Sequence, residues 1–246
     1  AFDQVAERLR EKFRCLAVDV RGRGQSDWGE PADYHNPQYV RDISALLREL
    51  GLERVHWLGT SMGGLIAMTL AAERPQLFES LVLNDIGPDL AKSGGRRIER
   101  FIAGLPPSFS SWEACIDFEA ERYPWIRDFS KAELEEAYRW YVRQREDGSW
   151  VFHFDPRVLG GRASSVERFR QARENHWFGL KALRCPTLLV RGAESDLLAR
   201  ETVEEMRRIQ PKMEFVEVPG VGHAPSLGEP EAAAALDAFY GRLAGQ

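Results

Sequence analysis

The chain has 246 residues, which is enough to bury a sizeable core in one α/β domain with an insertion. Its formal net charge of −5 comes from acidic and basic residues interspersed along the sequence, so nothing predicts a nucleic-acid partner. No apolar run reaches the roughly 20 residues that a membrane-spanning helix needs, and we expect no membrane partner.

The cysteines indicate the compartment. Cys15, Cys115 and Cys185 are too few and too scattered for a disulfide framework or a zinc site. Such a pattern is typical of a reducing compartment, and we expect a cytoplasmic protein. Composition leaves the oligomeric state open, with a homodimer as one alternative.

The first third of the chain alternates predicted helices with apolar runs typical of buried strands. In order, the sequence predicts a helix over 2–13, a strand over 15–20, a helix over 37–50, a strand over 55–58, a helix over 65–72 and a strand over 80–85. Strands and helices in alternation predict parallel pairing with right-handed crossovers.

The pattern changes between about Pro88 and Leu180. Helical segments are predicted over 96–104, 111–122 and 131–145, without buried strands between them. We therefore divide the chain into a core over 1–87, a helical cap over 88–180 and a second part of the core over 181–246. A cap of this kind excludes water and shapes an apolar pocket. We expect the substrate to contact Trp125 and Trp140 of the cap, and Leu197.

Alternation resumes after the predicted cap. The sequence predicts a strand over 185–192, a helix over 202–209, a strand over 214–218 and a closing helix over 231–243. The loops after these two strands carry the remaining candidate residues, because loops at the carboxyl ends of parallel strands meet at one edge of the sheet.

A Gly-x-Ser-x-Gly motif occupies residues 59–63, between a predicted strand and a predicted helix. In that context it predicts a sharp turn that presents Ser61 at the carboxyl end of the sheet, with a helix N-terminus that favours negative charge. We expect that side chains at Gly59 and Gly63 would collide with neighbouring backbone. A flexible turn without chemistry is the alternative interpretation.

A serine hydroxyl is a weak nucleophile until a base takes its proton. His223 is the best candidate, because it lies in the loop after the last predicted strand. Its imidazole needs a carboxylate to fix the tautomer. We favour Asp196, which completes the order Ser, Asp, His. Asp85, at the end of an earlier strand, is the alternative acid.

Four segments together resemble the α/β-hydrolase superfamily, and most closely its lidded serine hydrolases, which include small esterases, enol-lactonases and C–C bond hydrolases. The segments are Asp-Val-Arg-Gly-Arg-Gly-Gln-Ser-Asp at 19–27, Gly-Thr-Ser-Met-Gly-Gly at 59–64, Arg-Gly-Ala-Glu-Ser-Asp at 191–196 and Gly-His-Ala-Pro at 222–225. The resemblance covers nearly all of the chain outside the predicted cap. It implies a mostly parallel sheet flanked by helices, with a helical cap inserted.

The resemblance also implies roles for single residues. Ser61 is the expected nucleophile, His223 the base and Asp196 the acid, while the backbone N–H of Met62 is one oxyanion donor. The family takes its second donor from a His-Gly loop that would precede Ala1. The strand before that loop would fill the sheet interior, so we expect roughly 30–50 further N-terminal residues in the protein.

The function that the resemblance implies is cleavage of a small ester or lactone through a covalent acyl-enzyme, without a metal or organic cofactor. One alternative is hydrolysis of a C–C bond in a ring-fission product. That reaction needs a cation for a substrate carboxylate, and Arg157, Arg162 and Arg168 are the candidates. The other alternative is a catalytically slow ligand receptor on the same fold.

Overall fold

The computed structural model describes residues 2–122, 130–158 and 163–244. Its helices are α1 (Asp3–Leu9), α2 (Asn36–Glu49), α3 (Met62–Glu73), α4 (Lys92–Gly104), α5 (Trp112–Arg122), α6 (Lys131–Tyr138), α7 (Ala163–Ala182), α8 (Arg200–Ile209) and α9 (Pro230–Leu243). Its strands are β1 (Val55–Thr60), β2 (Phe78–Asn84), β3 (Val142–Gln144), β4 (Trp150–Phe152), β5 (Thr187–Gly192) and β6 (Glu214–Val218). No helix in these ranges has both the length and the apolar character needed to span a bilayer.

Four strands form a parallel sheet in the order β1-β2-β5-β6. All six residues of β5 are buried, and so are six of the seven in β2, which is typical of a parallel sheet covered on both faces. The predicted α/β architecture with parallel pairing is confirmed. Because all four strands run the same way, the loops that follow them leave the sheet at the same edge.

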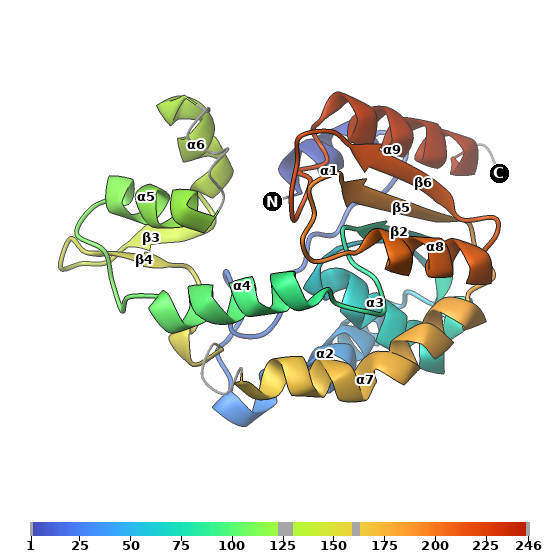
Figure 1. The fold of residues 1–246 in the computed structure, drawn as a ribbon, viewed down its shortest axis with the longest axis horizontal. Helices are drawn as coiled ribbons and strands as arrows, with labels where there is room; N and C mark the ends of the chain where they lie inside the picture. The colour runs from blue at the N-terminus through green and yellow to red at the C-terminus, as the bar shows by residue number, and fades with distance from the viewer. Residues whose placement is uncertain (1, 123–129, 159–162, 245–246) are drawn as a thin grey trace. The chain divides into compact units, whose positions relative to one another are not determined.

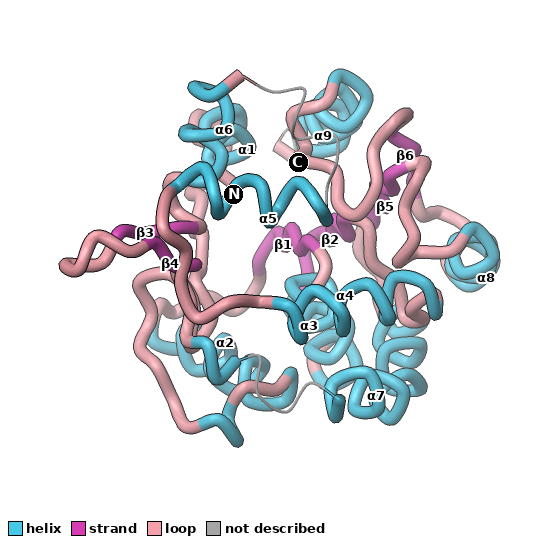
Figure 2. Tube along the Cα trace, turned by 60° about the vertical axis from the view of Figure 1, so that its left-hand side comes forward, coloured by secondary structure: helices cyan, strands magenta, loops and turns pink. Residues whose placement is uncertain are grey.

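Helices pack on both faces of this sheet (Figures 1 and 2). On one face, α1 and α9 supply Val5 and Phe239 to a core that also contains Val82, Leu188 and Val190. The other face is covered by α3 and α7. Side chains point to alternate faces along a strand, so the buried residues of β2 and β5 that lie next to these core residues in sequence pack on this second face.

Helix α3 lies deep in the fold and is apolar around most of its circumference. Its residues from Ile66 to Ala71 are all buried. Gly179 permits the close packing of α7, because a Cβ atom there would lie 1.9 Å from the carbonyl oxygen of Met68. This packing anchors the helix whose N-terminus carries the candidate nucleophile.

The contacts divide the chain into two compact units. One combines Val18–Tyr34 with Arg97–Arg162, and the other combines Phe2–Ala17, His35–Arg96 and Ala163–Gln246. The sheet described above belongs to the second unit. This division differs from the predicted 88–180 cap in three respects. Residues 88–96 and helix α7 group with the sheet, and the loop over 18–34 groups with the predicted cap residues.

The smaller unit has its own core and its own polar anchor. Phe109, Cys115 and Phe152 pack together in the core. The hydroxyl of Tyr34 donates to the buried carboxylate of Asp155 (Oη–Oδ2 2.5 Å), which ties the 18–34 loop to the rest of the unit. Desolvation and this hydrogen bond raise the pKa of Tyr34.

Two element predictions are wrong. Residues 15–20 form no strand, and Leu16 and Val18 are each 46% exposed, because no strand in the described ranges pairs with this stretch. The helix predicted over 131–145 ends at Tyr138, where an antiparallel β3–β4 hairpin replaces the expected helix-only cap. The signal was present in the Asp-Gly pair at 147–148, because such pairs mark hairpin turns and Gly148 adopts a φ of 82°.

His176 on α7 makes the stability of the fold sensitive to pH. It is 1% exposed, and burial lowers its pKa to about 4, although the negative charge of Asp89 opposes the shift. The unfolded chain therefore takes up a proton as pH falls below about 6.5, while the folded chain excludes it. The contribution of neutral His176 to the free energy of unfolding is fully present above pH 6.5 and is lost as the pH falls toward 4.

We expect the free energy of unfolding of the wild type, relative to His176→Leu, to fall by about 2 kcal/mol between pH 7 and pH 5. Urea unfolding of both proteins at each pH measures the difference. A difference that stays constant with pH would contradict the assignment.

Candidate active site

Ser61 lies at the turn between β1 and α3, with a φ of 50° and a ψ of −112°. Few residues other than glycine adopt a positive φ, and strain of this kind is concentrated at functional sites. The turn is tight, because a Cβ atom at Gly59 would lie 2.5 Å from the carbonyl carbon of Gly63. The backbone N–H of Ser61 donates to the carbonyl of Asn84 at 3.1 Å, which holds the turn against the end of β2.

The requirement for glycine differs in part from the prediction. Gly59 is needed as expected, but a Cβ atom at Gly63 would meet no heavy atom within 4 Å outside its chain neighbours and its own helix backbone. The second tight position is Gly64, where a Cβ atom would lie 2.3 Å from Cγ2 of Ile86. Because α3 begins at Met62, both glycines lie in its first turn. Successive residues of a helix point in different directions around its axis, so Gly64 can face the sheet while Gly63 does not.

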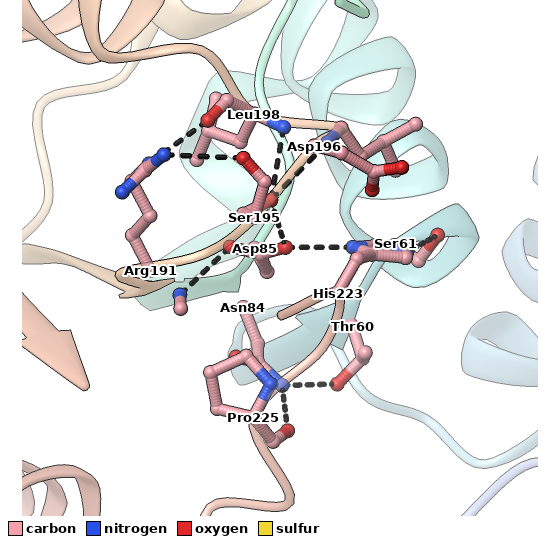
Figure 3. Close-up of polar contacts among 12 residues, drawn as sticks. Thr60, Ser61, Asn84, Asp85, Arg191, Ser195, Asp196, Leu198, His223 and Pro225 are labelled. Atoms are coloured by element: carbon pink, nitrogen blue, oxygen red, sulfur yellow. Dashed lines mark hydrogen bonds and ion pairs between the residues drawn. The ribbon is translucent and has the colours of Figure 1, made fainter. Parts of the chain in front are cut away.

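His223 lies in the loop after β6 and reaches the serine. Its Nε2 atom is 3.0 Å from Oγ of Ser61 (Figure 3). The histidine is 6% exposed, so its imidazole is largely shielded from water, whereas Ser61 is only partly buried. The structure therefore brings the predicted nucleophile and the predicted base within hydrogen-bond distance of each other.

The carboxylate behind the imidazole belongs to Asp85. Its Oδ2 atom is 2.7 Å from Nδ1 of His223, and the side chain is fully buried (Figure 3). Both ring nitrogens of His223 are thus engaged, one by Asp85 and one by Ser61. The preferred pairing of His223 with Asp196 is corrected, and the alternative acid occupies that position.

The positions of the two aspartates in their loops explain the correction. Asp85 follows directly after β2, so its carboxylate stays at the edge of the sheet where Ser61 and His223 also lie. Asp196 is four residues beyond the end of β5. Its backbone carbonyl accepts hydrogen bonds from Oγ of Ser93 and the N–H of Gly94 at the start of α4. Both aspartates satisfy the order Ser, Asp, His, so order alone does not distinguish them.

All four strands of the sheet contribute to this network. Ser61 follows β1, Asp85 follows β2 and His223 follows β6. The end of β5 and the loop after it supply two donors to Asp85, the N–H of Gly192 to Oδ1 at 2.9 Å and Oγ of Ser195 to Oδ2 at 2.6 Å. A buried carboxylate with three donors is a satisfied acceptor, as burial of a charge requires.

Comparison with known proteins identifies the family. The model of the alpha/beta hydrolase fold matches residues 1–230. The chain belongs to the α/β-hydrolase family.

Relatives of this α/β hydrolase are themselves hydrolases. The 3-hydroxybutyrate-oligomer hydrolase of Cupriavidus necator is 38% identical over 244 residues, which cover 97% of this chain and 83% of that protein. The 2-(acetamidomethylene)succinate hydrolase of Mesorhizobium japonicum is 29% identical over 231 residues, covering 94% and 79%. The crystal structure of an alpha/beta hydrolase from Novosphingobium aromaticivorans superimposes with a TM-score of 0.86 at 33% identity, covering 99% of this chain and 84% of that one.

Met62 is the first residue of α3 in this α/β hydrolase. The first N–H groups of a helix have no acceptor within the helix, and the helix dipole favours negative charge at that end. The N–H of Met62, next to Ser61, is therefore available to an oxygen that gains negative charge during attack on a carbonyl.

The predicted substrate contacts have separate outcomes. Trp125 lies outside the described residues. Trp140 is 50% exposed in the smaller unit, where the guanidinium of Arg139 lies 5.1 Å from the centre of its ring. Leu197 is 1% exposed and packs against Gly94. The roles of all three in binding stay predictions.

Sequence reasoning missed Asn84. Its Nδ2 atom donates to Oγ1 of Thr60 at 3.0 Å and to the carbonyl of Pro225 at 2.9 Å, so one buried amide joins the serine turn to the histidine loop (Figure 3). The available signal was a polar residue at the end of an apolar strand. Within the described ranges, no group of three or more His, Cys, Asp or Glu residues is arranged to hold a metal ion.

Proposed function

We propose that this α/β hydrolase cleaves a small carboxylic ester or lactone through a covalent acyl-enzyme, with Ser61 as nucleophile, His223 as base and Asp85 as acid. The observation that carries the proposal is the continuous chain of hydrogen bonds from Asp85 through His223 to Ser61, with separations of 2.7 and 3.0 Å. Such a chain is the arrangement that activates a serine hydroxyl.

In this mechanism Oγ of Ser61 attacks the substrate carbonyl while Nε2 of His223 accepts the hydroxyl proton. Asp85 holds Nδ1–H and stabilises the imidazolium that forms. The N–H of Met62, at the positive end of the α3 dipole, stabilises the oxyanion. His223 then protonates the leaving alcohol, and water releases the acid by the same steps.

The relative at 38% identity suggests the first substrates to test. Its name says that it hydrolyses 3-hydroxybutyrate oligomers. Hydroxy-acid units joined through their hydroxyl and carboxyl groups form esters, which this mechanism cleaves. We therefore propose short ester oligomers of 3-hydroxy acids as a substrate class, alongside p-nitrophenyl esters of short acids.

The C–C hydrolase alternative has less support. It requires a free cation near the substrate, but Nε and Nη2 of Arg157 both bond to the carboxylate of Asp155, at distances from 2.8 to 3.1 Å. Arg162 lies outside the described residues, and the side chain of Arg168 is not described. The slow-receptor alternative stays a prediction, which turnover measurements on the proposed substrates would exclude.

Labelling with a fluorophosphonate probe tests the proposed nucleophile. We expect one equivalent of probe per chain, located on Ser61 by peptide mass spectrometry, and slower labelling in the presence of an ester substrate. Labelling of a different residue, or steady ester turnover by enzyme that is fully labelled on Ser61, would contradict the proposal.

A further inference from the structure

The loop after β5 contacts the acid of the proposed triad. Ser195 donates its hydroxyl hydrogen bond to Oδ2 of Asp85 at 2.6 Å, and this is the oxygen that faces Nδ1 of His223. The N–H of Gly192 bonds to the other oxygen, Oδ1, at 2.9 Å. Both oxygens of the carboxylate are therefore bound, and His223 and Ser195 share Oδ2.

The hydroxyl of Ser195 has a defined direction. Its oxygen accepts the backbone N–H groups of Leu197 at 3.3 Å and Leu198 at 3.1 Å. A serine hydroxyl has one donor hydrogen and two acceptor lone pairs. With both lone pairs engaged by the loop, the hydrogen points to Asp85.

Arg191 holds the loop in the shape that makes this possible. Its guanidinium is buried at 4% exposed, with Nε bonded to the carbonyl of Leu198 at 2.8 Å and Nη2 to that of Ser195 at 3.2 Å. The ion pair between Nη1 and Glu217, at 2.7 Å, balances the charge. Carbonyls on both sides of the turn are thus bound to one rigid planar group.

We propose that Ser195 is a positioning residue for catalysis, which orients the carboxylate of Asp85 toward Nδ1 of His223. The final torsion of an aspartate side chain is broad, so packing alone orients its oxygens weakly. A fixed Oδ2 keeps the hydrogen of the imidazole on Nδ1 and leaves Nε2 to accept the proton of Ser61. This inference rests on the proposed triad and goes beyond it, because Ser195 acts through Asp85 and touches neither substrate nor nucleophile.

A double-mutant cycle with Asp85 distinguishes positioning from a general effect on the loop. In the wild type, Ser195→Ala should lower kcat for a p-nitrophenyl ester by about 10- to 100-fold, the worth of a hydrogen bond to a charged group, with KM unchanged. In an Asp85→Asn background the same substitution should lower kcat less than about twofold, since the group that it orients is gone. Equal losses in both backgrounds would overturn the proposal.

Two further serine variants complete the experiment. Ser93→Ala removes a hydroxyl that bonds to the same loop at the backbone carbonyl of Asp196 (3.0 Å) and not to the carboxylate of Asp85, and it should leave kcat unchanged. Ser195→Thr keeps the hydroxyl and should restore most of the activity lost in Ser195→Ala. If Ser195→Ala does not fold, Ser195→Cys, with a weak donor of similar shape, replaces it in the cycle. Full ester hydrolysis by Ser61→Ala would reject the proposed triad itself. A failure of the triad is therefore distinguishable from a failure of the positioning role of Ser195.

Discussion

Replacing Ser61 with alanine is expected to lower kcat/KM for a p-nitrophenyl ester by about 10⁴- to 10⁶-fold. The substitution removes the hydroxyl oxygen that lies 3.0 Å from Nε2 of His223, and with it the covalent route through an acyl-enzyme. Activity that remains would come from substrate binding and the oxyanion donors acting on water. Initial rates with the purified variant at high enzyme concentration measure the loss.

The fold should tolerate this change. Alanine keeps the Cβ atom and the backbone N–H that bonds to Asn84, so the midpoint of urea unfolding should match the wild type. Ser226→Ala is a matched control in the histidine loop, because its hydroxyl accepts the N–H of Gly228, two residues away, at 3.2 Å. A loss below about 100-fold in Ser61→Ala would mean that another group attacks the substrate.

The second large effect is expected at Asp85. Asp85→Asn should lower kcat/KM by about 10³- to 10⁴-fold, because an amide can present its donor to the imidazole and stabilise the wrong tautomer. It also leaves no negative charge beside the imidazolium. The same measurement on Asp196→Asn should give a loss of less than about tenfold, since Asp85 and Ser61 are the groups that bond to the two ring nitrogens of His223.

The two aspartate variants must be compared at equal folded fractions. Asp85 is fully buried and accepts three hydrogen bonds, so its substitution is expected to lower stability as well as activity. Urea unfolding of each variant gives the folded fraction under assay conditions. A larger loss in Asp196→Asn than in Asp85→Asn would restore the original assignment of the acid.

Local pattern predicted most of the elements well. The strands β1, β2, β5 and β6 and the helices between them follow apolar runs and helical spacing that short windows of sequence contain. The failures occur where an element depends on a partner. Residues 15–20 have the composition of a strand, but a strand exists only when another pairs with it. The β3–β4 hairpin is short, and its turn signal at 147–148 directly follows a segment with helical composition.

The residues of the candidate site also fall into two groups, those that local sequence signals place and those that only tertiary contacts place. Sequence by itself determined Ser61, its turn and His223, because the strand, glycine and loop signals that place them lie within a few residues of each one. Only the tertiary structure decided between Asp85 and Asp196 and revealed the contacts of Ser195 and Asn84. Parallel strands bring several loops to one edge, and which carboxylate reaches the imidazole there depends on ångström-scale packing between segments more than 100 residues apart.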